Sequence, residues 1–384
     1  MAHPLQGIKV LDLSRVLAGP WCTQTLADLG AEVWKIEEPT AGDDTRSWTP
    51  PDIGGESTYF LCCNRSKESL AIDLKSPEGR TIMIDLVRQA DVLVENFRLG
   101  ALDRIGLGYE DLRKFNPRLI YCSISGYGRS GSRAEEAGYD FAIQAESGLM
   151  SITGEPNGTP MKVGVAITDI VTGMNATQAI LAALIARSTT GEGQHLDIAL
   201  FDSAIALLAN VASSQLATAN APKRYGNAHP TVVPYQLMDT QDGVIALAVG
   251  NDSQFRTLCA RVLGQPELAE DSRFVTNRER SINRDVLIPL LASLFEAKPS
   301  GFWLAELKRF GIPAGAVRTV QEALSSPEAT ERAMVVTVAD RLHGELKLMN
   351  TPLKFSSTPT RFPKSPPRLG ENTREVLERL GVWG

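Results

Sequence analysis

Short apolar runs alternate with helical patterns along the first 130 residues, which is typical of βαβ units on a parallel sheet. Residues 8–13 (IKVLDL) form the first apolar run, and residues 18–29 follow with helical spacing. Gly30 fits a helix C-cap, and residues 31–36 form the second run. The other predicted strands are residues 70–74, 91–95 and 119–124. We therefore predict an α/β fold whose large domain has a Rossmann-like parallel sheet.

The turn after the first predicted strand carries no dinucleotide fingerprint. It reads SRVLAGP, residues 14–20, and lacks the GxGxxG pattern that brings a backbone close to a pyrophosphate. The sequence therefore argues against a nicotinamide- or flavin-dependent redox enzyme.

The middle of the chain predicts the end of one domain and the start of another. Residues 148–162 are a turn-rich connector, and residues 163–187 predict one long buried helix. A strand at residues 195–199 and a second apolar helix at 201–216 follow. We expect a large domain at residues 1–216 completed by about 330–384, a polar linker at 217–230, and a small α+β domain at 231–329.

Apolar periodicity also predicts the elements of the small domain and the segment that follows it. A strand at residues 244–249 and helices near 253–263, 281–295 and 302–310 supply its elements. Beyond it, the proline-rich residues 352–370 predict an extended segment that precedes a last helix at 371–380.

Composition excludes several classes of function. The chain of 384 residues is 43% hydrophobic and 22% charged with a net charge of −6, so it lacks the basic surface that nucleic acids require. The N-terminus lacks the pattern of a signal peptide, and no run of 18 apolar residues is present. We expect a cytoplasmic protein without nucleic-acid or membrane partners.

Cysteine and histidine positions favour neither disulfides nor a metal centre. Five cysteines without a CxxC pair and four scattered histidines suggest neither a disulfide framework nor a metal cluster. We expect reduced, mostly buried thiols and no metal site.

Asp169 is the most unusual acidic residue by position. It lies among Val163, Val165, Ile167, Ile170 and other apolar residues, where an ionised carboxylate costs several kcal/mol unless paired or needed for reaction. Two readings stay open: a reactive carboxylate, or an acid that caps a helix N-terminus together with Thr168. Both place the carboxylate near the positive end of a helix dipole.

Several other side chains could form a binding site. Asn96, Phe97 and Arg104 follow a predicted strand, and ligands of open α/β sheets bind at strand carboxyl ends. Phe97 could stack on a flat ring and Arg104 could pair with a phosphate, although a loop arginine is more often simply solvated. The further basic residues of this predicted anion-binding face are Arg15, Lys67, Lys75 and Arg98.

The remaining candidates have structural alternatives. Asp140 is more simply a helix N-cap or an acid in the first turn of a helix, and Trp48 and Tyr59 are more simply packing residues. His229, in GNAHPTVVPYQ, is either a loop histidine or a site residue.

Four motifs in order resemble the family III CoA-transferases, also called the CaiB/BaiF family. They are residues 5–46 (LQGIKVLDLSRVLAGPWCTQTLADLGAEVWKIEEPTAGDDTR), 64–80 (NRSKESLAIDLKSPEGR), 90–112 (ADVLVENFRLGALDRIGLGYEDL) and 163–174 (VGVAITDIVTGM). The resemblance runs from residue 5 to Gly370 and covers essentially the whole chain.

This resemblance implies a mechanism and a set of roles. Asp169 falls on the family's catalytic aspartate, which forms an acyl anhydride and then an enzyme–CoA thioester, and Tyr139 and Asp140 match residues of the reaction centre. The implied CoA contacts are Arg15, Val16, Ile72, Lys75, Asn96, Phe97, Ala101 and Arg104. CoA is then a thioester substrate, with no tightly bound cofactor. The family fold further implies an interlocked-ring homodimer.

Departures from individual branches guide the substrate prediction. Leu17, Ala137 and GNAHPTVVPYQ replace a glutamine, a basic residue and a glycine-rich loop of formyl-CoA transferase, which disfavours the formyl-CoA:oxalate pair. Tyr139 stands where the racemase branch has a histidine, and a phenol is a poor base at neutral pH. The sequence is similar instead to the branch that uses dicarboxylates such as succinate.

We therefore predict CoA transfer from a dicarboxylyl-CoA, such as succinyl-CoA, to a carboxylic acid. The residues predicted to meet the acid are Arg46, Trp48, Tyr59 and His229. Arg46 could instead pair with Asp43 or Asp44. The alternatives are an α-methylacyl-CoA racemase or epimerase, a formyl-CoA:oxalate transferase, or a CoA-binding protein without chemistry.

Overall fold

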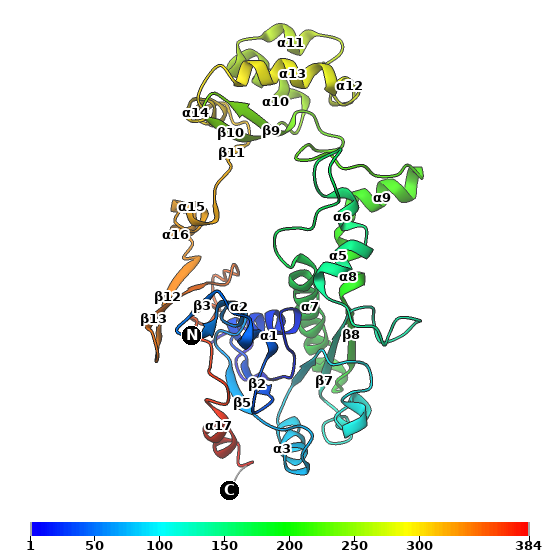
Figure 1. The fold of residues 1–384 in the computed structure, drawn as a ribbon, viewed down its shortest axis with the longest axis vertical. Coiled ribbons are helices and arrows are strands. Elements are labelled where there is room, and N and C mark those ends of the chain that lie inside the picture. Colours follow the sequence, from blue (N-terminus) through cyan, green and yellow to red (C-terminus); the bar gives the residue numbers. More distant parts are fainter. Residues whose placement is uncertain (1, 383–384) are drawn as a thin grey trace. The chain divides into compact units, whose positions relative to one another are not determined.

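Six parallel strands form the sheet at the centre of the first compact unit. The structure, a computed structural model, describes residues 2–382. The strands are β1 (Lys9–Asp12), β2 (Glu32–Glu37), β5 (Glu68–Ala71), β6 (Val92–Glu95), β7 (Ile120–Ser125) and β8 (His195–Ala199). Their order across the sheet is β5-β2-β1-β6-β7-β8, and every neighbouring pair is parallel. Figure 1 labels β5, β2, β7 and β8 of this sheet. This is the mixed α/β fold with a parallel sheet that the sequence predicts.

The strand order reverses between β1 and β6, the two central strands. β1 pairs with β2 on one side and with β6 on the other, so the connections run outward in both directions from this pair. In open α/β sheets, such a switch point leaves a crevice at the carboxyl ends of the strands. The fold therefore predicts a ligand site just beyond Asp12 and Glu95.

Helices cover both faces of the sheet because side chains alternate along each strand. On one face, Val10, Val92 and Ile120 pack with α1 (Ala18–Asp28), α7 (Ile167–Thr190) and α8 (Leu200–Leu207). On the other face, Leu11, Trp34 and their neighbours pack with α3 (Pro77–Val87) and α17 (Thr373–Arg379). The sheet is thus buried on both sides, as its apolar strands require.

The last residues of the chain complete the first unit. Asn372 and Thr373 bind the edge strand β5: the backbone N–H of Ser69 donates to Asn372 Oδ1 at 3.1 Å, and that of Ala71 to Thr373 Oγ1 at 2.9 Å. Val376, from α17, is fully buried in the core of the same unit. The C-terminal segment is therefore part of this fold.

The chain divides into two compact units. The first comprises residues 1–149, 162–219 and 327–384, and the second comprises residues 150–161 and 220–326. The second unit contains an antiparallel sheet in the order β11-β10-β9 with its own core around Phe255, Phe274 and Phe295. The predicted bounds 217–230 and about 330 lie near the places where the chain passes between the units. Residues 150–161, predicted as a connector, contribute to the second unit.

The other helices and strands are short. In the first unit they are η1 (Asp44–Ser47), β3 (Asp52–Ile53), β4 (Glu56–Ser57), α2 (Thr58–Cys62), η2 (Asp103–Ile105), α4 (Tyr109–Leu112), α5 (Asp140–Glu146), α9 (Ala209–Thr218), α16 (Pro327–Glu331), β12 (Val335–Asp340) and β13 (Gly344–Met349). In the second they are β9 (Tyr235–Thr240), β10 (Gly243–Ala248), α10 (Asp252–Thr257), the π-helix η3 (Leu258–Leu263), α11 (Pro266–Glu270), α12 (Asn277–Ile282), α13 (Arg284–Phe295), α14 (Ser300–Arg309), β11 (Ala314–Ala316) and α15 (Val320–Leu324). Helix α6 (Leu149–Ile152) spans the first boundary.

The apolar helices after residue 163 differ from their predicted form. The long helix begins at Ile167, and the predicted helix 201–216 is two helices, α8 and α9, bent by 75° at Ala209, whose φ is +40°. By length and composition α7 could cross a membrane, as could α8 and α9 taken together, which corrects the expectation that no such segment exists. Core helices of soluble proteins meet the same criteria, and Ala176, Ile180 and Ala183 of α7 belong to the core.

Candidate active site

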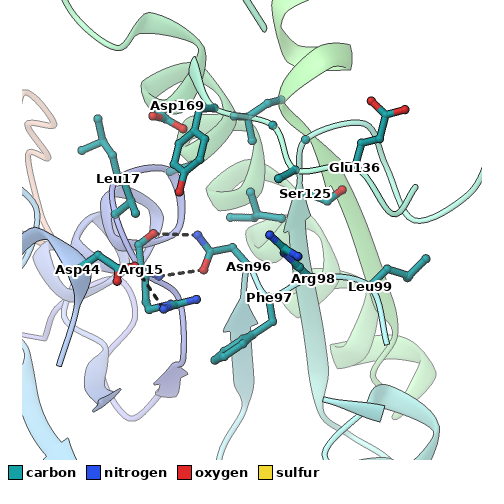
Figure 2. A pocket seen from close by; sticks show the side chains of 18 of the residues that line it. Arg15, Leu17, Asp44, Asn96, Phe97, Arg98, Leu99, Ser125, Glu136 and Asp169 are labelled. Carbon is teal, nitrogen blue, oxygen red and sulfur yellow. Dashed lines mark hydrogen bonds and ion pairs between the residues drawn. The ribbon is translucent and has the colours of Figure 1, made fainter. Parts of the chain in front are cut away.

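A cavity of about 560 Å³ opens at the carboxyl ends of β1 and β6, where the strand order reverses. The loop after β1 contributes Arg15 and Val16, and the loop after β6 contributes Asn96 and Phe97. Figure 2 shows Asn96 between the two loops, hydrogen-bonded to Arg15. The remaining lining residues are Leu17, Ala18, Asp44, Trp48, Arg98, Leu99, Ile124, Ser125, Gly126, Ala134, Glu135, Glu136, Ala137, Gly138, Tyr139, Asp169 and Leu200.

Asp169 reaches this cavity from the first turn of α7. It lies neither in the middle of an apolar helix nor at the N-cap, which is Ala166. Burial raises the pKa of the Asp169 carboxyl to about 7, and the negative charge of Asp140 acts in the same direction. A carboxyl group with a raised pKa in a cavity is a candidate functional group.

Asp140 holds the start of α7 in place. Its Oδ1 accepts the backbone N–H of Thr168 at 2.9 Å and the Thr168 hydroxyl at 2.6 Å. Its Oδ2 accepts the side-chain amide of Gln144 at 2.7 Å. Asp140 therefore joins the first turns of α5 and α7 and satisfies a backbone donor that the helix itself leaves unpaired.

Two glycines form the cavity wall beside Tyr139, a residue whose side chain is 64% exposed. Gly126, after β7, and Gly138, before α5, lie back to back: a Cβ built on Gly138 would stand 2.5 Å from Gly126 Cα. No side chain fits between two backbones this close. The glycines thereby bring the segment that carries Tyr139 against the end of β7.

The predicted CoA contacts divide into those that line the cavity and those that do not. Arg15, Val16, Asn96 and Phe97 line it together. The Arg15 guanidinium lies 5.3 Å from the Phe97 ring centroid and 3.2 Å from an oxygen of Asp44. Lys75, Ala101 and Arg104 are outside the lining, with Lys75 and Arg104 on the exposed surface.

Two predicted residues have buried side chains outside the cavity lining. Ile72 is 4% exposed and packs in the core between the sheet and α3. Lys67, expected on an anion-binding face, has a fully buried side chain and donates to Asp12 Oδ2 at 2.8 Å. Ile72 is buried because it packs against other apolar residues, and Lys67 is buried because it pairs with Asp12.

Arg46 pairs with a neighbouring acid, Glu37. Its guanidinium donates to both oxygens of Glu37, at 2.8 and 2.7 Å, and lies 3.7 Å from the Phe60 ring centroid. The surface pairing with Asp43 or Asp44 that the sequence left open is therefore replaced by a bidentate pair with Glu37. The role of Arg46 toward a substrate carboxylate stays a prediction.

Trp48 and Tyr59 both line a cavity. They line a second cavity of about 520 Å³ with Cys62, and Trp48 lines the first cavity as well. Their rings meet edge to face at 4.9 Å. Burial raises the pKa of the Tyr59 phenol, and the charge of Asp169 adds to it, so Tyr59 stays protonated.

His229 belongs to the second compact unit. Its Nδ1 accepts the backbone N–H groups of Thr231 and Val232, at 3.1 and 3.0 Å, and its ring tilts against Tyr235. Its role toward a substrate stays a prediction.

One of the five cysteines, Cys62, lines the second cavity. The five cysteines are free, and all but Cys62 are buried, as expected. Within residues 2–382, no three His, Cys, Asp or Glu side chains gather in a metal-binding arrangement.

Sequence reasoning missed residues 134–136, which line the cavity. It also missed Asp43 and Lys35, which lie beneath the loop after β1 as an ion pair at 2.9 Å. A buried lysine within an apolar strand, as in EVWKIE, was the available signal for the pair.

Comparison with known proteins agrees with this geometry. The model of CoA-transferase family III matches residues 5–373. The chain is 42% identical over 377 residues to human succinyl-CoA:glutarate CoA-transferase, covering 98% of this chain and 86% of that protein. It is 43% identical over 334 residues to acetyl-CoA:oxalate CoA-transferase of Acetobacter aceti, covering 87% of this chain and 85% of that protein.

A solved structure has the same fold. The crystal structure of a CaiB/BaiF family protein from Brucella suis superposes with a TM-score of 0.88 at 46% identity, covering 99% of this chain and 100% of that chain. Both the family match and these relatives extend over nearly the whole sequence. The chain therefore belongs to CoA-transferase family III.

Proposed function

We propose that this CoA-transferase moves CoA from a dicarboxylyl-CoA, with succinyl-CoA as donor, to a dicarboxylic acid such as glutarate, with Asp169 as nucleophile. The observation that carries the chemistry is the Asp169 carboxyl, which faces the cavity at the sheet's switch point with a pKa of about 7. The choice of acids rests on the human relative's name, which specifies succinyl-CoA and glutarate.

The proposed reaction uses Asp169 twice. Its carboxylate attacks the thioester carbonyl of the donor, the C–S bond breaks, and CoA leaves as a thiolate while a mixed anhydride forms. The thiolate then attacks the Asp169 carbonyl carbon, which releases the donor acid and leaves an aspartyl–CoA thioester. The acceptor carboxylate then attacks the aspartyl–CoA thioester, which releases the CoA thiolate and forms a second mixed anhydride. The thiolate attacks the acceptor's carbonyl carbon, which gives the product acyl-CoA and regenerates the Asp169 carboxylate. The cycle causes no net change in bound protons.

The surroundings of Asp169 suit this sequence. Burial removes much of the water that would otherwise solvate the carboxylate, which makes it a better nucleophile. A pKa of about 7 still leaves a large ionised fraction at neutral pH. The N-terminal turn of α7 adds a positive dipole end near the negative charge that develops on the attacked carbonyl oxygen.

For CoA we propose the cavity between the loops after β1 and β6. Phe97 offers a flat surface, Asn96 a rigid amide, and Arg15 and Arg98 supply positive charge at the cavity wall. Lys75, Ala101 and Arg104 would meet only a part of CoA that extends outside the cavity. Trp48 and Tyr59 are proposed to meet the acyl chain, because the second cavity that they line adjoins the first through Trp48.

We further propose that the protein works as an interlocked homodimer in the cytoplasm. Helices α7, α8 and α9 expose large apolar side chains, with Ile185 at 72% and Leu216 at 87% exposure. Exposed apolar surface of this kind on a soluble enzyme usually marks an interface. Light scattering at nanomolar concentration should give a dimer, and a folded 41.6 kDa monomer would contradict the proposal.

A panel of CoA donors and acids tests the function. We expect succinyl-CoA with glutarate to give glutaryl-CoA, identified by mass, and incubation with succinyl-CoA alone to leave CoA or a succinyl group on Asp169 of a digested sample. Oxalate is a necessary arm, because the Acetobacter relative's name includes it. Deuterium from solvent entering the α carbon without transfer would indicate a racemase instead.

A further inference from the structure

The turn of residues 14–16, between β1 and α1, has an unusual backbone. Arg15 and Val16 line the cavity, and Val16 has a φ of +71°. A β-branched residue rarely adopts this left-handed conformation, because its Cβ crowds the backbone. Something outside the turn must therefore hold it there.

Side chains bind every backbone N–H and C=O of this turn. The contacts are Ser14 N–H to Asp12 Oδ1 (3.0 Å), Lys35 Nζ to Ser14 O (2.9 Å), Arg15 N–H to Asn96 Oδ1 (2.9 Å), Asn96 Nδ2 to Arg15 O (2.8 Å), Val16 N–H to Asp43 Oδ1 (3.2 Å) and Cys63 Sγ to Val16 O (3.5 Å). None of these partners is a neighbouring strand or helix backbone. The conformation of the turn is thus set by a ring of side chains.

A buried charge cluster, made of Asp12, Lys35, Asp43 and Lys67, supplies half of these contacts. All four side chains are fully buried, and their formal charges cancel. Lys35 Nζ lies 2.9 Å from Asp43 Oδ2 and 4.0 Å from Asp12 Oδ2. Despite burial, Lys35 holds the pKa of Asp43 below its usual range, so Asp43 accepts the Val16 N–H as a carboxylate.

Stability alone does not explain this cluster. Apolar residues of similar volume often stabilise a fold as well as a buried ion pair does, because removing charges from water is costly. The cluster's particular effect is geometric, since it fixes the backbone that faces the cavity. Preorganising a binding surface in this way lowers the entropy lost when a ligand binds.

We propose that Asp43 and Lys35 are positioning residues for acyl-CoA, acting through the left-handed turn at Val16. Asp43 anchors the Val16 N–H, and Lys35 anchors both Asp43 and the Ser14 carbonyl. This proposal rests on the proposed function in one respect, namely that the cavity takes CoA.

Two double variants, with a third in reserve, separate the loss of the buried charges from the loss of the acceptor for the Val16 N–H. Each removes one positive and one negative charge. Lys35→Met/Asp43→Asn removes both charges but keeps an amide oxygen that can accept the Val16 N–H. Lys35→Met/Asp43→Ala removes the charges and the acceptor together. Lys35→Met/Asp43→Leu fills the Asp43 space without an acceptor and replaces the alanine variant if that variant does not fold. The control is Arg65→Met/Asp28→Asn, which removes another buried pair that does not contact the turn.

The readouts are the Kd of CoA by titration calorimetry, the KM of each substrate, kcat and thermal unfolding. We expect the asparagine variant to bind CoA within about threefold of the wild type, and the alanine or leucine variant to bind at least about tenfold more weakly. The KM of the acceptor acid and kcat should change little. The control should lose stability without a change in the Kd of CoA.

Equal Kd values for the asparagine and alanine variants, or a parallel rise in both KM values, would overturn the positioning role. Failure of the wild type to bind CoA would instead contradict the proposed function of the cavity, so the two failures are distinguishable.

Discussion

Asp140 holds the residue that precedes Asp169, and its negative charge also raises the pKa of the Asp169 carboxyl. One carboxylate therefore performs two tasks: it fixes the N-terminal turn of α7 through Thr168, and it opposes ionisation of the neighbouring acid. Burial acts in the same direction and is the larger cause. The local structure that positions the proposed nucleophile thus also adjusts its proton affinity.

Asp169→Asn should abolish transfer but stabilise the fold at alkaline pH. Folding raises the pKa of this acid from 3.8 to about 7, so the carboxylate opposes folding increasingly between these values and fully above them. Removing the charge should raise the free energy of unfolding at pH 8 by up to about 4 kcal/mol, and by little near pH 4. Denaturant titrations at the two pH values measure this. A variant less stable than the wild type at pH 8, or one retaining about a tenth of its activity, would contradict the assignment.

The pH profile of the wild type should follow ionisation of Asp169. The attacking form is the carboxylate, so kcat/KM for acyl-CoA should rise with pH and level off above about 7. Asp140→Asn keeps an oxygen for Thr168 and removes the like charge, so the midpoint should fall by about half a unit or more. An unchanged midpoint with a folded variant would leave burial as the sole cause. The profile is measured at saturating acceptor.

Gly138→Ala should damage the cavity wall. The added Cβ would stand 2.5 Å from Gly126 Cα and 3.2 Å from Ile143 Cδ1, and a backbone neighbour cannot rotate away. We expect a loss of about 1–3 kcal/mol in stability and at least about tenfold in kcat/KM. Gly164→Ala is the matched control, since its Cβ would meet nothing within 4 Å. Equal behaviour of the two variants would show that the close approach is not required.

Arg15→Ala and Arg104→Ala should differ in their effect on acyl-CoA binding. Arg15 lines the cavity and lies against Phe97, whereas Arg104 is exposed and outside the lining. We expect the KM for acyl-CoA to rise about tenfold for Arg15→Ala, since a charge-assisted contact is worth about 1.5–3 kcal/mol. The KM for the acceptor acid should stay close to that of the wild type. A larger effect of Arg104→Ala would place the phosphates of CoA farther out on the surface.

The acceptor series should favour diacids with a methylene chain. The second cavity, lined by Trp48 and Tyr59, offers apolar volume that oxalate cannot fill. Each buried methylene contributes about 0.8 kcal/mol, so glutarate should exceed oxalate in kcat/KM by about tenfold or more. Trp48→Ala should narrow that ratio. Oxalate as the best acceptor would contradict the proposed chain site.

Local patterns predicted most of the first unit. Strands β1, β2, β5, β6, β7 and β8 and helices α1 and α7 lie within a few residues of their predicted positions, because apolar periodicity reports burial directly. The hairpin β12–β13 and strand β9 were missed. Each of these strands has only one or two buried residues among exposed and half-buried ones, which gives a weaker signal than a fully buried strand.

The lining of the candidate site was predictable where polar or aromatic residues directly follow an apolar strand. Asn96, Phe97 and Arg15 follow apolar strands and do line the cavity. Arg46, Lys67 and Ile72 lie outside the lining of both cavities, and a one-dimensional pattern does not reveal which partner a charge meets or which side of a strand end is covered. Tertiary pairing, as between Arg46 and Glu37, decides those positions.

The bonds from Asn372 and Thr373 to strand β5 have a consequence for how the protein is made. The edge strand β5 and part of the core around Val376 receive these partners from residues that are translated much later than the strand itself. The emerging strand β5 must therefore wait, with its edge and part of one apolar face uncovered, while the 300 residues between Ala71 and Asn372 are translated. An incomplete chain exposes the surfaces on which aggregation begins, so premature termination before Asn372 should yield insoluble protein rather than a shortened enzyme.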